Sequence, residues 1–221
     1  MGLTATLVTL LGTVATVTLS PLMALDEVQV LGTERLSAAE VESSLELHLG
    51  TPLALLDESG IRDDLAEFRL IRSYSTEIVP PHTLVVRIVE REPVGAIERD
   101  GAVELVDAAG VVVESSTERP EGIPVIRVSA LDPDEPAFRG VSSVLVALPS
   151  AVRSRVDIIT ATTRDDVSFT MTGAGHEVIW GSDERSAYKA RVLEAAIEAT
   201  DQGVAWVYDV SAPDSLVVRR R

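Results

Sequence analysis

Cysteine is absent from this 221-residue sequence. Its absence excludes disulfide frameworks, thiolate metal sites and thiol redox chemistry, so any folded part of the chain must be stabilised by burial of its core alone. Lysine is almost absent as well, because Lys189 is the single lysine among 19 basic residues. We attribute this bias to coding composition rather than to mechanism.

Positive charge is also scarce, since 19 basic residues face 35 acidic ones and the net charge is −16. Three of the basic residues stand together at 219–221, so the rest of the chain is more acidic still. Such a surface repels nucleic acid and anionic lipid headgroups. We therefore expect no nucleic-acid partner.

The spacings of known catalytic and metal-binding motifs are missing too. His48, His82 and His176 fall in three separate predicted elements, and none belongs to an H-E-x-x-H pattern. The carboxylate pairs at 63–64 and 165–166 are sequence neighbours, whose side chains diverge on a helix or strand. We expect no enzyme activity, no cofactor, no metal site and no small-molecule substrate.

No charged residue occurs from Gly2 to Leu25, and most of this segment is apolar. About 20 helical residues cross a bilayer core. Residues 1–25 are therefore predicted to form a transmembrane helix that anchors the protein, with Asp26 and Glu27 marking its end. A cleaved signal peptide is the alternative, but it would need a basic start and a small-x-small cleavage site, neither of which is present.

The orientation of this anchor is predicted with the N-terminus in the cytoplasm and the rest of the chain outside. Basic residues normally mark the cytoplasmic flank of a span, yet none precedes Arg35. We expect such a flank ahead of Met1, either because Met1 is an internal start or because a basic tail has been removed.

Four threonines of the predicted anchor share one helical face, and they are Thr6, Thr9, Thr13 and Thr16. Hydroxyl and small residues allow transmembrane helices to approach closely and to form hydrogen bonds with each other. These residues are candidates for transmembrane packing against partner helices. A lipid-facing stripe, in which each hydroxyl bonds to its own helix, is an equally open interpretation.

The residues after the anchor predict a small β-α-α-β-β unit. Apolar and polar residues alternate over 28–32 and again over 83–90, which indicates half-buried strands, and 70–79 forms a third strand. Ser37 and Glu40 form a capping box that begins one helix. A second helix after Asp57 is predicted to bury Ile61, Leu65 and Phe68.

The remainder of the chain is rich in short strands separated by turns. The predicted strands are 94–97, 103–107, 111–113, 156–161, 167–171, 176–180, 204–210 and 216–219. One helix is predicted from Asp132 to Pro149 and another after 182–184, the latter with Tyr188, Val192, Leu193, Ala196 and Ala199 on its apolar face. Periodicity alone assigns this region to the α+β class.

Several short motifs, in order along the chain, closely resemble those of the FtsQ/DivIB family, whose first soluble domain is a POTRA domain. They are Val28-x-Val30-x-Gly32, Gly50-Thr51-Pro52-Leu53, Pro81-His82-Thr83-Leu84-Val85-Val86, Glu90-Arg91-Glu92-Pro93-Val94, Leu105-Val106-Asp107-Ala108-Ala109-Gly110-Val111, Ile123-Pro124-Val125-Ile126 and Tyr208-Asp209-Val210-Ser211-Ala212-Pro213-Asp214. The resemblance implies an anchor over 1–25, a POTRA domain over 26–92 and an FtsQ-type β domain over 93–221. For the last of these it implies a curved mixed sheet with helices on one side.

The resemblance also implies a function, that of a bitopic scaffold of the bacterial divisome at the division septum. The implied partners are FtsB/FtsL-like bitopic coiled-coil proteins, with an FtsW/FtsI-like pair of septal wall synthesis proteins as further candidates. The alternative is an anchored extracytoplasmic enzyme or a POTRA-type transport or assembly protein. Such proteins would show a clustered catalytic site, tandem POTRA repeats or a barrel, and the sequence pattern predicts none of these.

Family likeness places partner binding along the last strands of the β domain. The matching residues are Trp206, Tyr208, Asp209, Val210, Ser211, Leu216, Val217 and Val218. A final strand has one unpaired row of backbone groups to which an extended segment can bind. Trp206 and Tyr208 are candidates for aromatic anchoring of a partner, but as residues i and i+2 on one face they are equally candidates for the core.

Overall fold

The structure is a computed structural model that describes residues 20–99 and 101–221. The chain divides into two compact units at the bond between Arg91 and Glu92. Among the described residues, no helix is long and apolar enough to cross a membrane. The predicted anchor and its threonines Thr6, Thr9, Thr13 and Thr16 lie almost wholly in the residues outside this description.

The end of the uncharged run is described, and it belongs to the folded first unit. A 3-10 helix, η1, spans Pro21–Met23, and the side chain of Leu25 is 1% exposed. The Leu25 N–H donates to the carbonyl of Thr51 at 2.8 Å, and the Leu25 carbonyl accepts from Gly50 at 2.8 Å. Leu25 is thus a core residue of this unit rather than part of a membrane span.

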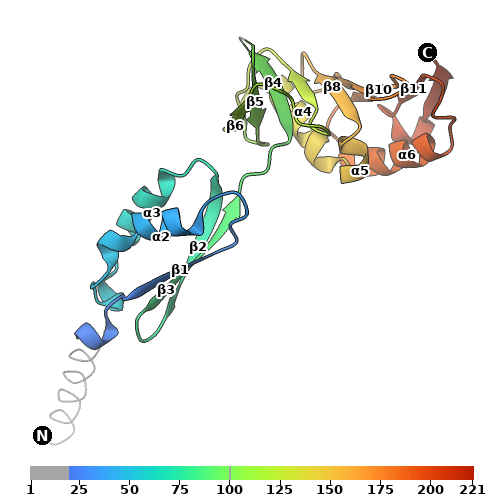
Figure 1. The fold of residues 1–221 in the computed structure, drawn as a ribbon. Helices are drawn as coiled ribbons and strands as arrows, with labels where there is room; N and C mark the ends of the chain where they lie inside the picture. The colour runs from blue at the N-terminus through green and yellow to red at the C-terminus, as the bar shows by residue number, and fades with distance from the viewer. Residues whose placement is uncertain (1–19, 100) are drawn as a thin grey trace, which may run out of the picture. The chain divides into compact units, whose positions relative to one another are not determined.

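The first unit has the predicted β-α-α-β-β order (Figure 1). Its elements after η1 are β1 (Glu27–Leu31), α2 (Ala38–Ser44), η2 (Glu46–His48), η3 (Leu53–Leu55), α3 (Glu58–Ala66), β2 (Ile71–Val79) and β3 (Thr83–Glu90). The three strands form a sheet in the order β1-β3-β2, with β1 parallel and β2 antiparallel to β3.

Side-chain caps begin both helices of this unit, α2 after Ser37 and α3 after Asp57, and of the two only Ser37 was predicted as a cap. Ser37 accepts a hydrogen bond from the backbone of Glu40, and Asp57 accepts one from the backbone of Ser59. Each cap pairs one of the backbone N–H groups that a helix start leaves without an internal partner.

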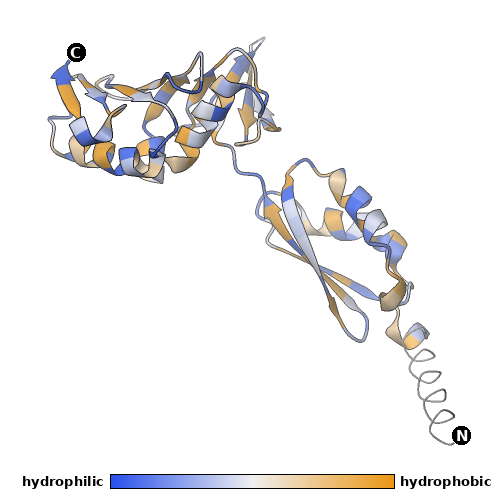
Figure 2. Cartoon of the chain, turned by 180° about the vertical axis from the view of Figure 1, so that it is seen from behind, coloured by the Kyte–Doolittle hydropathy of each residue, from blue (hydrophilic) through white to orange (hydrophobic). Residues whose placement is uncertain are grey.

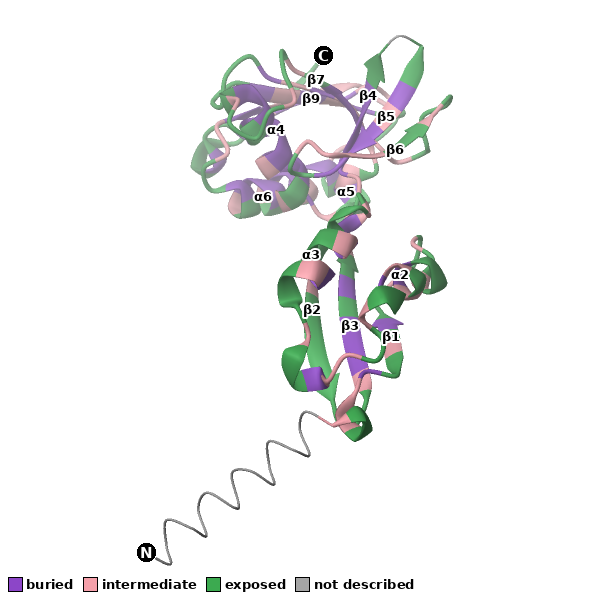
Figure 3. Cartoon of the chain, turned by 90° about the vertical axis from the view of Figure 1, so that its left-hand side faces the viewer, coloured by how far each residue is buried: buried purple, intermediate pink, exposed green. Residues whose placement is uncertain are grey.

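The core of the first unit lies between these helices and one face of the sheet. Leu84, Val86 and Ile88 alternate along β3 and are all buried, as the alternation predicted. Ile61 and Leu65 of α3 are buried against them, while Phe68 is partly buried. Figure 3 shows β3 with long buried stretches between the more exposed strands β1 and β2.

The second unit contains a nine-stranded mixed sheet in the order β12-β11-β10-β9-β8-β7-β4-β5-β6. Its strands are β4 (Gly95–Arg99), β5 (Ala102–Val106), β6 (Val112–Ser116), β7 (Val125–Arg127), β8 (Val156–Thr160), β9 (Val167–Met171), β10 (Glu177–Gly181), β11 (Trp206–Asp209) and β12 (Val217–Arg220). Its helices are α4 (Pro136–Ala147), α5 (Ser150–Arg153), α6 (Ser186–Glu198) and the 3-10 helix η4 (Pro213–Ser215).

The helices α4, α5 and α6 lie on one side of this sheet (Figure 1). Between them and the strands is one large core, which includes Phe138 and Leu145 of α4, Leu193 of α6, and Trp180 and Tyr208 of the strands. Hydrophobic and hydrophilic stretches alternate along the helices of both units (Figure 2), as expected for helices with one buried face. The α+β class predicted from the sequence is confirmed.

Three elements of the second unit were not predicted, and one of them is the 3-10 helix η4. The strand β7 pairs in parallel with β4 and with β8, and at three residues it is too short to show a period. The helix α5 follows directly after Pro149, where the sequence predicted only the end of a helix.

The predicted apolar face of α6 was also partly wrong. Leu193 and Ala196 are buried, but Ala199 is exposed and Tyr188 and Val192 are only partly buried. The buried face is completed by Ser186, Lys189, Ala190 and Ile197. The prediction placed only apolar residues on the buried face, and it therefore missed the buried polar residues Ser186 and Lys189.

Replacement of Leu65 by alanine should destabilise the first unit. Leu65 is 1% exposed within the core, so the substitution removes buried methyl groups and leaves a cavity, at a cost of about 2–5 kcal/mol. Urea unfolding of a fragment spanning 20–221 measures this loss. Leu55→Ala is the matched control, because Leu55 is 60% exposed and should change little. Equal stability of the two variants would contradict the position of α3.

Candidate functional site at the terminal strand

The strands β10, β11 and β12 form one end of the large sheet. β11 runs parallel to β10, and β12 turns back antiparallel to β11. β12 is the last strand in the order, so in the part of the chain that the structure describes it pairs on one side only. The other side of β12 therefore presents a row of unpaired backbone groups.

The register of β12 shows which of its N–H groups face outward. The Arg221 N–H donates to the carbonyl of Ala205 at 3.0 Å. Donors alternate along an antiparallel strand, so the N–H groups of Val217 and Arg219 also face β11. Those of Val218 and Arg220 face away from the sheet, where an added strand would receive them.

Two of the predicted binding residues belong to the core. Tyr208 and Val210 are both 0% exposed. The Tyr208 hydroxyl is 2.6 Å from the hydroxyl of Thr200, and its ring meets the imidazole of His176 edge to face at 5.6 Å. Tyr208 and Val210 therefore do not present side chains to a partner, and for Tyr208 the core alternative is the correct one.

Trp206 is partly buried against the same core. Its indole N–H donates to the carbonyl of Asp201 at 2.8 Å. The guanidinium carbon of Arg220 lies 5.6 Å from the centre of its ring, within the range of a cation–π contact. The Trp206 ring is thus occupied by a contact with Arg220 of β12 within the same chain.

The exposed members of the predicted set lie at and before β12. Val217 is 52% exposed and Leu216 is 37% exposed, whereas Val218 packs partly against the core. Ser211 is exposed, and its backbone and hydroxyl both donate to Asp209, at 3.0 and 2.6 Å. The side chains available to a partner are therefore Leu216 and Val217 with the polar turn after β11.

Ion pairs hold the turn that leads into β12. Arg185 donates to both carboxylate oxygens of Asp214, at 2.7 and 3.2 Å, and so links the start of α6 to η4. The hydrogen bonds from Arg185 hold the pKa of Asp214 below its usual value. At the far end of β12, Arg221 pairs with Glu177 of β10 at 3.7 Å.

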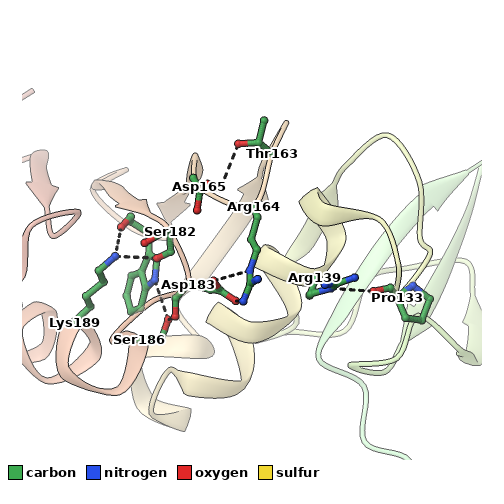
Figure 4. Close-up of polar contacts among 10 residues, drawn as sticks. Pro133, Arg139, Thr163, Arg164, Asp165, Ser182, Asp183, Ser186 and Lys189 are labelled. Atoms are coloured by element: carbon green, nitrogen blue, oxygen red, sulfur yellow. Dashed lines mark hydrogen bonds and ion pairs between the residues drawn. The ribbon is translucent and has the colours of Figure 1, made fainter.

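The single lysine has a structural position that the sequence did not predict. Lys189 is 2% exposed, and its ammonium donates to the carbonyls of Trp180 at 3.0 Å and Ser182 at 2.8 Å (Figure 4). Burial lowers the pKa of Lys189. The contacts fix the loop between β10 and α6, and Asp183 of that loop forms a bidentate pair with Arg164 of the turn between β8 and β9.

Two other carboxylates have a lowered pKa because backbone N–H groups of nearby loops donate to them. Burial raises the pKa of Glu90, but the backbone N–H groups of residues 34–36 donate to its carboxylate and bring the pKa below its usual value. Burial likewise raises the pKa of Asp166, but hydrogen bonds from the Thr162 hydroxyl and from the backbone of Thr162 and Thr163 bring it below its usual value. Among the described residues, no cluster of three histidine or carboxylate side chains could hold a metal ion.

The buried histidine of this end is neutral. His176 is 0% exposed, and its Nδ1 atom accepts the backbone N–H of Trp206 at 3.2 Å, so that nitrogen carries no proton. Among residues 20–99 and 101–221, no polar atom meets the distance and angle of a hydrogen bond to its Nε2 atom. Burial lowers the pKa of His176 below its ordinary value of 6.5; Gln202 partly offsets this, and Arg155 adds to it.

The stability of the second unit should therefore fall as the pH drops below about 6.5. The unfolded chain then binds a proton at His176 that the folded chain does not bind. The contribution of His176 to the free energy of unfolding is therefore fully present above pH 6.5 and is lost as the pH falls toward the lowered pKa of the folded state. Urea unfolding between pH 8 and about 5 measures the slope. His176→Gln keeps a side-chain acceptor and should flatten it, while His82→Gln, at an exposed position, should not. An unchanged slope in His176→Gln would refute this assignment.

Comparison with known families covers both units. The family model for the POTRA domain, FtsQ-type, matches residues 23–91. The family model for the cell division protein FtsQ/DivIB, C-terminal, matches residues 96–210. The second match stops at Val210 and so leaves β12 outside it.

Curated relatives align with most of this chain. Cell division protein FtsQ of Streptomyces bingchenggensis is 32% identical over 202 residues, which cover 87% of this chain and 75% of that protein. The FtsQ of Mycobacteroides abscessus is 32% identical over 200 residues, covering 90% of this chain and 63% of that protein. A solved structure of the extracytoplasmic domain of DivIB from Geobacillus stearothermophilus matches with 24% identity and a TM-score of 0.39, over 52% of this chain and 98% of that one. The chain belongs to the FtsQ/DivIB family of cell division proteins.

Proposed function

We propose that this protein is a non-enzymatic bitopic scaffold of the divisome that binds its partners along β12. Membership of a family of cell division proteins supports the divisome role. The partners proposed are FtsB/FtsL-like coiled-coil proteins and, together with them, an FtsW/FtsI-like pair of septal wall synthesis proteins. The protein would sit in the cell membrane at the septum, with both units outside the cytoplasm.

One observation carries this proposal, namely the free edge of β12 with exposed Val217 beside it. An extended partner segment can accept the outward N–H groups of Val218 and Arg220 and donate to the outward carbonyls of the same two residues. Val217 and Leu216 then supply apolar contact at 52% and 37% exposure. The three arginines 219–221 favour an acidic partner segment on a chain that is otherwise strongly acidic.

The membrane anchor in this proposal is shorter than residues 1–25. Because Leu25 is a core residue, the uncharged run left for the bilayer is 2–19. As a helix, such a run would measure about 27 Å, close to the thickness of a bilayer core.

Replacement of Arg220 by proline should abolish partner capture while the chain stays folded. Proline removes the outward N–H, and proline is tolerated on an edge strand when its missing donor faces solvent. Arg220→Ala is the matched control, because it loses the same side-chain contact with Trp206 but keeps the N–H. Pull-down of FtsB-like partners from membranes measures binding, and thermal unfolding reports folding.

A proline substitution in β12 tests strand addition only where the N–H that it removes faces away from β11. Val217→Pro removes an inward N–H and should destabilise β12 itself, so a loss of binding there would not isolate the edge. Val217→Lys changes only an exposed side chain and should weaken capture, whereas Val146→Lys, on α4 at 57% exposure, should not. Wild-type capture by a folded Arg220→Pro variant would refute strand addition.

Tagged protein should form a ring at midcell, and replacement of Thr6, Thr9, Thr13 and Thr16 by leucine should weaken that ring. Polar contacts between transmembrane helices average only about 0.6 kcal/mol, so all four must be changed together. Membrane fractionation should show unchanged insertion. A normal ring would favour the lipid-facing interpretation of the stripe, and a uniform membrane signal of the wild type would contradict the divisome role.

A further inference from the structure

Exposed apolar side chains gather at one end of the first unit. Eleven large apolar residues of the described chain are exposed, and six of them belong to three segments at this end. The six, named here the apolar end, are Leu22, Leu47, Leu49, Leu55, Ile78 and Val79, with exposures from 40% to 87%. Figure 2 shows orange stretches at this end of the unit, beside η1 and the turn between β2 and β3.

Backbone bonds bring these three segments together. Ala24 forms a β-bridge with Pro52, which ties the segment after η1 to the loop that carries Leu49 and Leu55. The Asp26 N–H donates to the carbonyl of His82 at 2.9 Å, which ties the same segment to the turn after Val79. A shallow pocket lined by Leu22, Leu49 and His82 lies where the segments meet.

The position of this end in the chain indicates what covers it. Leu22 belongs to the uncharged run that begins at Gly2, and it is three residues from residue 19. A chain spans that separation with at most about 11 Å. If residues 2–19 enter the bilayer, the apolar end is therefore held at the membrane surface by covalent connection.

The charges beside this end select the kind of membrane surface. Asp26, Glu27 and Glu46 are exposed near these apolar residues, and no lysine or arginine lies in residues 20–34 or 36–61. Contact must therefore come from apolar side chains entering the headgroup region of neutral lipid, because anionic headgroups would be repelled. Exposed apolar groups of this number on one end are typical of an interaction surface.

We propose that the apolar end docks into the interface of the bilayer that holds the anchor, with neutral lipid as its occupant. This inference rests on the single anchor of the proposed function but not on the binding edge at β12. Docking through three segments would restrict the tilt of the first unit on the membrane surface more than the covalent connection to the anchor alone.

The absence of cysteine allows a direct test with single labels. The full chain is reconstituted into phosphatidylcholine vesicles with a polarity-sensitive fluorophore on Leu47→Cys, Leu55→Cys or Ile78→Cys. Val89→Cys is the matched control, since Val89 is 45% exposed against 48% for Ile78 and lies at the opposite end of the same sheet. Six residues of strand separate it from Thr83, a distance of about 20 Å.

Labels on the apolar end should show emission shifted to the blue and quenching by spin-labelled lipid, and the label at 89 should show neither. Partial replacement of neutral by anionic lipid should reduce both signals. Flotation of the vesicles reports the anchor separately. If the chain floats but all labels behave as in water, docking is wrong and the anchor stands. If the chain does not float, both the anchor and the docking are overturned.

A Leu47→Glu, Leu55→Glu double variant should lose the blue shift of the Ile78→Cys label. Midcell recruitment of the same variant is measured separately, because it tests the divisome role and not the docking.

Discussion

The exposed edge of the large sheet depends on the burial of β11 against α6. Tyr208 and Val210 are fully buried, and the Tyr208 hydroxyl meets Thr200 just beyond the end of α6. β12 pairs only with β11 among the described strands, so whatever fixes β11 also fixes the edge. With no cysteine in the chain, this burial is the main source of its rigidity. A rigid edge lowers the entropy lost when a partner strand adds to it.

Surface charges organise this end without dominating its stability. The pairs Arg185–Asp214 and Arg221–Glu177 lie at more than one-third exposure, and such pairs contribute about 0–1 kcal/mol each. Their effect is positional, since they tie η4 and the end of β12 to neighbouring elements. Lys189 differs, because it is 2% exposed and its ammonium donates to two backbone carbonyls.

Alternation predicted most of the strands, and the capping box at Ser37 predicted the start of α2. Leu84, Val86 and Ile88 illustrate why. Every second side chain of a strand points to the same face of the sheet, so a strand with one buried face shows apolar residues at every second position. The same rule could not place β7, whose three residues show no period. The helical period likewise did not place Lys189 of α6 in the core, since lysine is rarely buried and only the carbonyls around it reveal the position. The order of motifs identified the family, but burial alone separated Tyr208 from the exposed residues of the predicted edge.

The apolar end and the β12 edge share one feature, which is that most of the exposed large apolar side chains lie on them. Of the eleven exposed large apolar side chains, six form the apolar end and two, Leu216 and Val217, lie at the β12 edge. Only Leu31, Val89 and Val146 lie elsewhere among the described residues. A chain this acidic stays soluble without exposing apolar groups, so their concentration at two places is informative. Hydropathy could not have shown it, because Leu22 and Leu25 belong to one uncharged run and only the fold buries Leu25 while it leaves Leu22 exposed.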